Sequence, residues 1–340
     1  MERHSLIFSN PKKIEIKKEE VAKPKTNQVL IKTIFSSISS GTEILFYKNQ
    51  IKKNMILDKI INNLQRPFRY PFKFGYSTVG KIISVGNKVS SKWLNKTVFV
   101  FHPHENYFLA NTDELIPIPK NIKPIQATFL PSMETAVNLV MDGSPSIGEN
   151  ILIYGQGIIG LLTTSLSSLY PINKIITVEP HPYRRKKSEE LGADKSIKPS
   201  DSPINYFEDG TGADLAYELS GNPDVLESAI TNTRYNGRIV IGSFYGNKKT
   251  SISLDEKFHR NRIQILSSQV STINPIYAGR WNRDRRRKLC WKFINTIKPE
   301  RLISHKISFE KAAEAYQLLD KYQDKTLQII FEYLEGNKNV

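Results

Sequence analysis

Three glycines in this sequence have the spacing that holds a diphosphate. The motif Gly-Gln-Gly-Ile-Ile-Gly of residues 155–160 directly follows the apolar run Ile151–Tyr154 and opens a stretch of helical character. Between a strand and a helix, the first glycine permits a tight turn, the second lets the backbone approach a pyrophosphate, and the third allows close packing. Glu179 closes the next apolar run about 20 residues on, where a carboxylate can accept hydrogen bonds from ribose hydroxyls. We therefore predict a dinucleotide site here.

Glu179 also bears on which dinucleotide binds. A carboxylate at this place repels a 2′-phosphate and favours NAD over NADP. His181, Arg184 and Arg185 leave NADP open, because a basic residue just past the strand can hold that phosphate; the alternative for both arginines is the exposed face of a helix. The predicted cofactor-binding residues are Gly155, Gln156, Gly157, Ile158, Ile159, Gly160, Glu179, Arg184 and Gly221.

The elements around this motif change character near Asn150. Before it, short runs rich in β-branched residues predict strands and a β-rich domain; these runs are Gln28–Phe35, Val79–Val85 and Thr97–Phe101. After it, apolar runs alternate with helical stretches, which is typical of βαβ units around a doubly wound parallel sheet. The predicted segments are strands at Ile151–Tyr154, Lys174–Val178, Asp214–Leu219, Gly237–Ile241 and Ile263–Leu266, and helices from Ile158, over Arg184–Leu191 and over Val225–Ile230. The fold class is α/β.

Composition narrows the class of protein. A chain of 340 residues with 39% hydrophobic content is long enough for two domains. No apolar run approaches the roughly 20 residues of a membrane span, and the first residues lack a secretory signal, so we expect a cytoplasmic protein without membrane insertion. The single cysteine, Cys290, excludes an internal disulfide and a multi-thiolate metal site; we interpret it as structural, with a reactive thiol as the alternative.

The formal net charge of +16 raises the question of nucleic acid binding. Basic residues concentrate in Lys48–Lys96 and in Arg280–Lys288. No recognisable nucleic-acid-binding module accompanies either segment, so a solvated surface is favoured and no nucleic acid partner is expected.

The order of a β-rich first domain, a Rossmann unit and a short tail resembles the medium-chain dehydrogenase/reductase superfamily over essentially the whole chain. The supporting segments are Ser39–Glu43, Gly75–Gly86, Glu114–Pro119, Glu190–Asp194 and Glu218–Gly221. The resemblance implies a nicotinamide-dependent oxidoreductase with a GroES-like catalytic domain at 1–138, a Rossmann domain at 139–270 and a return to the catalytic domain at 271–340.

The sequence departs from the zinc-dependent members of that superfamily at the metal ligands. The resemblance places a cysteine, then a His-Glu pair, then a further Cys or Glu ligand. At these positions this chain has Ser40, then Tyr76 and Ser77, then Pro131 or Ser132. Zinc prefers thiolate, imidazole or carboxylate, and hydroxyls are poor ligands. The structural zinc lobe is also missing, since the region between Phe101 and Leu115 lacks cysteine. We therefore expect no zinc.

His102, His104 and Glu105 could instead form a metal site of their own. Two alternating residues at a strand end would still need a third ligand from elsewhere. The alternatives are an exposed turn, or His102 or His104 lining the substrate cleft.

Without a Lewis acid, a hydroxyl or imidazole must handle the proton that accompanies hydride transfer. By resemblance, Thr42 falls where the superfamily keeps a Ser or Thr that passes on the alcohol proton, and Glu43 where it keeps an acid near the metal. Tyr76, in the place of the lost histidine, can donate a hydrogen bond to a developing alkoxide; the alternative is that it only fills space. Thr42, Glu43 and Tyr76 are the predicted catalytic residues.

The stretch Arg66–Phe74 mixes arginine with aromatic rings in a region that, by resemblance, borders the substrate cleft. This composition suits an anionic or sizeable planar substrate, although the basic residues could also only reflect composition. The predicted cleft residues are Arg66, Arg69, His102 and Glu134.

The segment Phe258–Val270 resembles a zinc-free subset similar to bacteriochlorophyllide hydroxyethyl dehydrogenase. In such folds the last Rossmann strand commonly forms a dimer contact, so Ile263–Val270 is a candidate homodimer edge, with a buried strand as the alternative. The predicted function is hydride transfer between NAD(H) and an alcohol or carbonyl carbon of a small molecule, without zinc. Two alternatives stay open: a zinc-free enone or quinone reductase, and a non-catalytic nucleotide-binding protein.

Overall fold

The computed structural model describes residues 1–333, and the chain divides into two compact units. The first comprises Met1–Pro131 and Trp291–Val340, and the second comprises Ser132–Cys290. The first unit is therefore built from two separate stretches of chain. Residues 334–340 of the predicted return segment lie outside the described residues, and the predicted boundaries after residues 138 and 270 stay a prediction.

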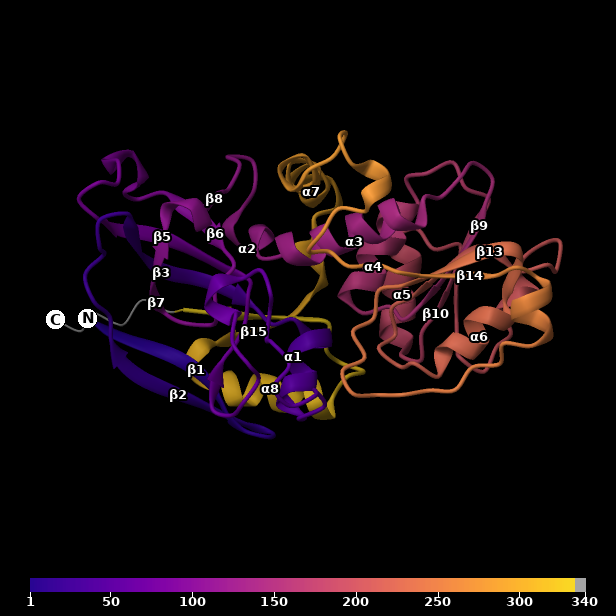
Figure 1. Cartoon of the computed structure of the whole chain (residues 1–340), viewed down its shortest axis with the longest axis horizontal. Helices are drawn as coiled ribbons and strands as arrows, with labels where there is room; N and C mark the ends of the chain where they lie inside the picture. Colours follow the sequence, from indigo (N-terminus) through magenta and orange to yellow (C-terminus); the bar gives the residue numbers. More distant parts are fainter. Residues whose placement is uncertain (334–340) are drawn as a thin grey trace. The chain divides into compact units, whose positions relative to one another are not determined.

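The first unit contains two β-sheets. In the larger sheet the strand order is β15-β16-β3-β5-β6-β8, with β7 also paired to β3; in the smaller it is β2-β1-β4. Strands β3, β5 and β6 lie side by side in Figure 1, as their antiparallel pairing requires. The strands are β1 (Glu2–Asn10), β2 (Lys13–Glu20), β3 (Gln28–Ser37), β4 (Phe72–Lys73), β5 (Thr78–Val85), β6 (Thr97–Val100), β7 (Tyr107–Asn111), β8 (Ile116–Pro117), β15 (Ile303–Ser308) and β16 (Gln328–Glu332).

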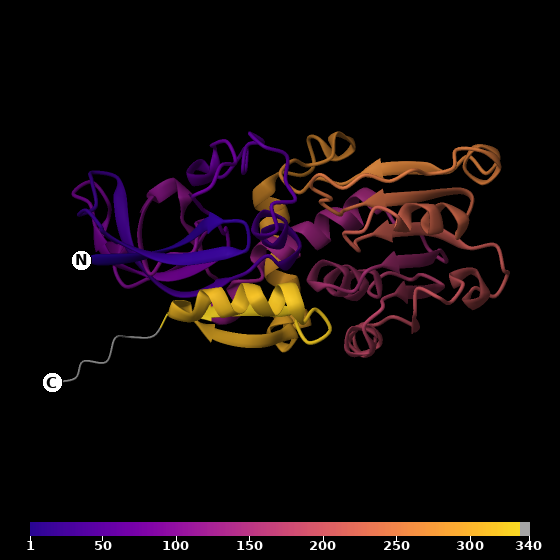
Figure 2. The same ribbon diagram turned by 90° about the horizontal axis from the view of Figure 1, so that it is seen from below.

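Short helices complete this unit. They are α1 (Ser40–Tyr47), α2 (Pro124–Ala127) and α8 (Ala312–Lys321). Figure 2 shows α8 in yellow beside a yellow strand of the same C-terminal segment. The chain crosses between the units within α3 (Leu130–Gly143) and within α7 (Arg283–Ile297).

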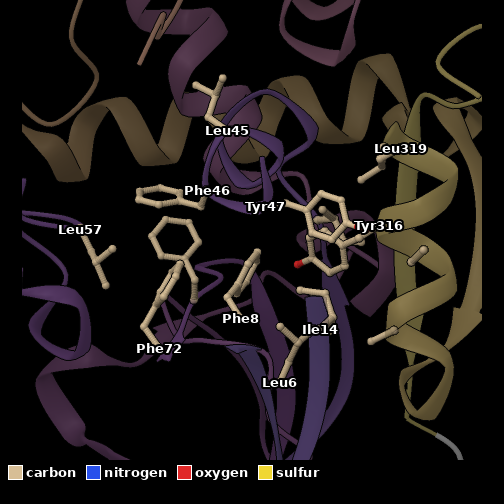
Figure 3. Close-up of a cluster of buried hydrophobic side chains, with 14 of the residues drawn as sticks. Leu6, Phe8, Ile14, Leu45, Phe46, Tyr47, Leu57, Phe72, Tyr316 and Leu319 are labelled. Atoms are coloured by element: carbon tan, nitrogen blue, oxygen red, sulfur yellow. The ribbon is translucent and has the colours of Figure 1, made fainter. Parts of the chain in front are cut away.

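A cluster of aromatic and aliphatic side chains forms one core of the first unit. Figure 3 shows Phe8 from β1, Phe46 from α1, Phe72 from β4 and Tyr316 from α8 meeting there. The rings of Phe8 and Phe72 stack with centroids 5.0 Å apart, and such contacts between segments far apart in sequence hold α1 and α8 against the sheet.

The second unit is a parallel sheet with helices between its strands. The strand order is β11-β10-β9-β12-β13-β14, and every pairing is parallel. The strands are β9 (Asn150–Tyr154), β10 (Lys174–Val178), β11 (Lys195–Ile197), β12 (Ala213–Glu218), β13 (Thr233–Ile241) and β14 (Gln264–Ser267), and the helices are α4 (Ile158–Ser167), α5 (Pro182–Glu190) and α6 (Val225–Thr231).

Both faces of this sheet are buried. Leu152 and Tyr154 of β9 enter one core cluster while Ile151 and Ile153 enter another, because successive side chains of a strand point to opposite faces. Burial on both faces explains why these strands read as continuous apolar runs in the sequence. The predicted α/β class, with a β-rich part and a Rossmann-type parallel sheet, is confirmed.

The start of helix α5 differs from the sequence-based prediction. Helix α5 begins at Pro182 rather than Arg184, because proline is favoured in the first turn, where its missing N–H leaves no hydrogen bond unmade. Within residues 1–333, no helix combines the length and the apolar character needed to cross a membrane.

Candidate functional site

The glycine loop of the second unit has the geometry predicted for a diphosphate site. Gly155 follows β9 with φ +85°, and an added Cβ would lie 2.6 Å from the Ser220 backbone. A Cβ on Gly160 would lie 1.9 Å from the Gly155 carbonyl oxygen, so this glycine lets α4 pack on the loop. At Gly157, which caps α4, a Cβ would meet no atom within 4 Å. The open space lies where a helix N-terminus attracts an anion.

Glu179 lies at the end of β10 and is 2% exposed. Its carboxylate accepts hydrogen bonds from the backbone N–H of Gln156 at 2.7 Å and of His181 at 3.0 Å. Glu179 thus ties the glycine loop to the end of the neighbouring strand. The residues present therefore fit a dinucleotide, with the glycine loop for its diphosphate and Glu179 for its ribose.

The other predicted cofactor residues lie near these strand ends. Ile158 and Ile159 form the first turn of α4, and Arg184 lies in the first turn of α5. Gly221 follows β12 with φ +71°; its N–H donates to Ser243 Oγ at 2.9 Å, and Lys248 Nζ donates to its carbonyl at 2.7 Å. Strand ends at one edge of a parallel sheet are where open α/β folds bind ligands.

The predicted catalytic residues of the first unit share one hydrogen-bonded cluster. The Tyr76 hydroxyl donates to Ser39 Oγ, and Thr42 also hydrogen-bonds to the phenol. Ser39 caps α1, so the helix start brings Ser39 and Thr42 together. All three side chains keep partial exposure. Burial of the phenol by the surrounding protein atoms nevertheless raises the pKa of Tyr76 to about 12, and the hydrogen bonds between the phenol and Ser39 and Thr42 oppose this only in part.

Glu43 lies behind these hydroxyls and is fully buried. Its Oε1 accepts from the backbone N–H of Ser39 at 2.7 Å, and its Oε2 accepts from the Tyr316 hydroxyl at 2.5 Å. The same Oε2 lies 3.1 Å from His104 Nε2. Glu43 thereby joins the start of α1 to two residues that come from other parts of the chain.

The side chains at the positions of the zinc ligands do not suit a metal. Tyr76 bonds to Ser39, and Ser77 donates its hydroxyl to the Thr128 carbonyl at 2.6 Å. The remaining candidates, Ser40 and either Pro131 or Ser132, offer at most hydroxyl oxygen. This donor set lacks the thiolate, imidazole and carboxylate that zinc prefers, so the residues present do not fit the ion.

His102 and His104 have different partners. His102 stacks on Phe108 with ring centroids 3.9 Å apart, and its Nε2 lies 3.0 Å from Glu105 Oε2. Glu105 also accepts from Lys73 Nζ at 2.8 Å, whereas His104 contacts Glu43. Within residues 1–333, no three or more His, Cys, Asp or Glu side chains lie close enough together to hold a metal ion.

Glu105 is a buried carboxylate whose negative charge is stabilised by neighbouring groups. Burial alone would raise its pKa, but the hydrogen bond and charge of His102, followed by the charge of Lys73, outweigh burial and lower the pKa to about 2. This group therefore stays ionised over the whole neutral range.

The aromatic rings of Arg66–Phe74 do not form an open surface for a planar substrate. Phe68, Phe72 and Phe74 are buried in the core cluster. Arg66 and Arg69 are exposed; Arg66 donates to the Lys73 carbonyl at 3.1 Å and Arg69 to Asn54 at 2.9 Å. The three phenylalanine rings therefore pack inward and offer no surface to a planar substrate, while Arg66 and Arg69 face solvent.

Glu134 lies in the second unit among arginines of α7. It is 5% exposed, with Arg286 at 3.9 Å and Arg287 at 4.0 Å. Burial raises its pKa, and the charges of Arg286 and Arg287 offset this only in part. Cys290 is fully buried nearby, and burial raises the pKa of its thiol. A protonated thiol is a poor nucleophile, as its structural interpretation expects.

Sequence reasoning missed two members of the cluster around Glu43. His104 was considered as a metal ligand, as part of an exposed turn or as a residue lining the substrate cleft, but not as a partner of Glu43, and Tyr316 was not considered at all. They lie 61 and 273 residues from Glu43 along the chain, so no local spacing connects them. Ser39 was quoted only within a motif, although its position before α1 is a signal for a helix cap.

Comparison with known proteins agrees with this arrangement. The family described as zinc-binding dehydrogenase matches residues 159–282. D-guloside 3-dehydrogenase of Escherichia coli K12 is 25% identical over 326 residues, covering 89% of this chain and 92% of the relative. L-threonine 3-dehydrogenase of Pyrococcus furiosus is 28% identical over 277 residues, covering 71% and 75%.

A solved structure shows the same fold across the chain. It is described as the short chain alcohol dehydrogenase rspB of Escherichia coli CFT073 with NADH; its TM-score is 0.78 at 20% identity, covering 98% of this chain and 99% of that one. The fold, the glycine loop and these relatives define the class of protein as a nicotinamide-dependent oxidoreductase. Their similarity over most of the chain supports the resemblance to the medium-chain dehydrogenase/reductase superfamily.

Proposed function

We propose that this protein transfers a hydride between NAD(H) and an alcohol or carbonyl carbon, using hydrogen bonding in place of a catalytic zinc ion. The observation that carries this proposal is the Tyr76 phenol, joined to Ser39 and Thr42 at a position where zinc-dependent relatives, by resemblance, have a metal ligand. A pKa of about 12 keeps this phenol protonated at neutral pH. A neutral phenol can donate a hydrogen bond to a substrate oxygen.

The chain's own residues have separate tasks in this reaction. The backbone of residues 155–160 and the N-terminus of α4 bind the diphosphate, and Glu179 selects NAD by its charge. The bound nicotinamide ring supplies the hydride acceptor or donor. On substrate binding the single Tyr76 O–H turns from Ser39 Oγ to the substrate oxygen, while the Ser39 and Thr42 hydroxyls hold the phenol oxygen in place. The alcohol proton leaves through the partly exposed Thr42 hydroxyl to solvent.

The proposed substrate is a polar alcohol that is either negatively charged or a sizeable molecule. The net charge of +16 and the exposed Arg66 and Arg69 support an anion. His102 and Glu134 stay candidate cleft residues. The two dehydrogenases similar to this chain are named for a guloside and for threonine, which supports a polar substrate.

The proposal extends to assembly and location. Strand β14 (Gln264–Ser267) forms one edge of the parallel sheet, so Ile263–Val270 is available for pairing in a homodimer. Light scattering coupled to size-exclusion chromatography would measure the mass of the particle, and a monomer at micromolar concentration would contradict the dimer. We also propose a cytoplasmic location.

A substrate panel tests the reaction. Secondary alcohols with and without carboxylate or phosphate groups are offered with NAD⁺ and NADP⁺, and enones and quinones with NADH and NADPH. We expect oxidation of anionic or polar alcohols with NAD⁺. Enone or quinone reduction without any alcohol oxidation would replace the proposal by the reductase alternative.

A further inference from the structure

A layer of fully buried polar side chains lies behind the partly exposed residues Ser39, Thr42 and Tyr76. Glu43, His104, Tyr316 and Ser36 each have 0% exposure. They come from α1, from the turn between β6 and β7, from α8 and from β3. The proposed reaction as stated above gives no task to His104, Tyr316 or Ser36.

His104 is held by hydrogen bonds at both ring nitrogens. Nε2 lies 3.1 Å from Glu43 Oε2, and Nδ1 lies 2.7 Å from Ser36 Oγ. Ser36 Oγ in turn lies 2.8 Å from the Tyr333 hydroxyl. With both nitrogens engaged, the ring has one orientation, and this orientation places a polar partner directly on the Glu43 carboxylate.

His104 also contacts the backbone that carries Tyr76. Its N–H donates to the Phe74 carbonyl at 3.2 Å. Its ring lies against Gly75, where an added Cβ would be 2.6 Å from His104 Cδ2 and where φ is +115°. Only glycine meets both conditions without strain, so the residue next to Tyr76 is packed directly on the imidazole.

Folding alone does not require this arrangement. Burying a carboxylate and an imidazole removes both from water, and well-packed apolar side chains of similar volume are often as stable or more so. Glu43 is compensated by a phenol, a backbone N–H and His104. Burying these polar groups next to the proposed reacting hydroxyls is unfavourable for stability, which points to a role for them in the reaction.

We propose that His104, supported by Tyr316, fixes the Glu43 carboxylate that orients Ser39, and through Ser39 positions the Tyr76 phenol for the substrate oxygen. His104 is thus a positioning residue that acts through Glu43 and through Gly75. This inference rests on the proposed function, because it deepens the role given there to Tyr76. A misplacement of a reacting group by about 1 Å costs on the order of 100-fold in rate.

A double-mutant cycle on kcat tests the proposal with His104→Leu and Tyr76→Phe, alone and combined, on an alcohol that the substrate panel identifies. His104→Leu is expected to lower kcat at least about tenfold and to leave the Kd for NADH unchanged. In the Tyr76→Phe background the same substitution should change kcat less than about twofold, because the group it positions is already gone. His104→Gln keeps a side-chain donor toward Glu43 and should restore most of the lost rate.

A matched control separates positioning from general destabilisation. His4 lies in the same unit and pairs with Glu2 and Glu310 instead of the cluster. His4→Gln should leave kcat unchanged. Tyr316→Phe removes only the other hydrogen bond to Glu43, and we expect a smaller loss of kcat in the same direction. If His104→Leu does not fold, Tyr316→Phe takes its place in the double-mutant cycle.

A readout without turnover uses protein labelled with ¹³C at the ζ carbon of tyrosine. The Tyr76 resonance is assigned by its loss in Tyr76→Phe, and it should move in His104→Leu and Tyr316→Phe but stay in place in His4→Gln. Losses in kcat that multiply fully in the double variant, or an unmoved Tyr76 resonance, would overturn the proposal. If Tyr76→Phe lowers kcat but His104→Leu does not, only the positioning role fails; if Tyr76→Phe is silent, the role of Tyr76 fails with it.

Discussion

The glycine loop of the second unit and the Tyr76 cluster of the first are built from different materials. The loop is made of backbone: Gly155 and Gly160 lack the Cβ that would clash with neighbouring backbone, and Gly157 leaves open space. The cluster is made of side chains from segments that are distant in sequence, with Tyr76 and Ser39 in front and Glu43 behind. A backbone site fails when atoms are added to it, and a side-chain site fails when atoms are removed.

Two glycines in the same loop give the largest predicted effect. Gly160→Val places atoms against the Gly155 carbonyl, so we expect a lower Tm and loss of NADH binding. At Gly157 an added Cβ would meet no protein atom within 4 Å, so we expect Gly157→Val to keep the wild-type Tm without cofactor while its Kd for NADH rises at least about 100-fold. Calorimetry and NADH fluorescence measure both; wild-type affinity in Gly157→Val would contradict the site.

Glu105 is a buried carboxylate outside the Tyr76 cluster, so we expect it to contribute to stability and not, as Glu43 does, to the position of the Tyr76 phenol. Glu105→Gln removes a charged partner of both Lys73 and His102, and we expect the free energy of unfolding to fall by about 3 kcal/mol at neutral pH, with kcat unchanged. The folded-state pKa of about 2 lies below the ordinary 4.5. The stability from Glu105 is therefore complete above about pH 4.5 and is lost as pH falls towards about 2.

Urea unfolding of wild type and Glu105→Gln across this range measures that contribution. The difference between the two proteins should shrink steadily below pH 4.5, the ordinary pKa. A difference that stays constant with pH would show that the carboxylate is not held ionised by its partners.

Tyr76→Phe removes one oxygen from the cluster. We expect kcat to fall about 100-fold with an unchanged Kd for NADH, because only the donor to the substrate oxygen is lost. Tyr70→Phe is the matched control: Tyr70 lies in the same unit, its pKa is also raised to about 12 by burial, and its hydroxyl donates to the Phe46 carbonyl. Steady-state kinetics in which both variants lose rate equally would assign the effect to packing.

Glu179→Gln gives the smallest expected effect. The substitution removes the charge that repels a 2′-phosphate but keeps an acceptor for the Gln156 N–H. The ratio of kcat/KM for NADP⁺ to that for NAD⁺ should rise about tenfold. If this ratio stays at its wild-type value, Glu179 does not select the cofactor.

Local patterns predicted the elements of the second unit well. The apolar run Lys174–Val178 became β10 with the same bounds, because a strand buried on both faces is a continuous apolar run. The glycine loop was also readable, since its function lies in residues adjacent in sequence. The hairpin of β1 and β2 was not predicted.

The side-chain cluster could be predicted only in part. Resemblance pointed to Thr42, Glu43 and Tyr76, but the partners of Glu43 depend on tertiary contacts across 61 and 273 residues. The burial of Phe68, Phe72 and Phe74 could have been predicted, because aromatic residues at every second position are typical of an extended segment with one buried face.

The central claim is that hydroxyl groups, and not a zinc ion, act on the substrate oxygen. Its most direct test measures zinc per chain and kcat in the same freshly purified protein, before and after prolonged chelation. The account predicts substoichiometric zinc and a kcat that chelation leaves unchanged. One tightly bound Zn²⁺ per chain, whose removal abolishes turnover and whose return restores it, would contradict the account.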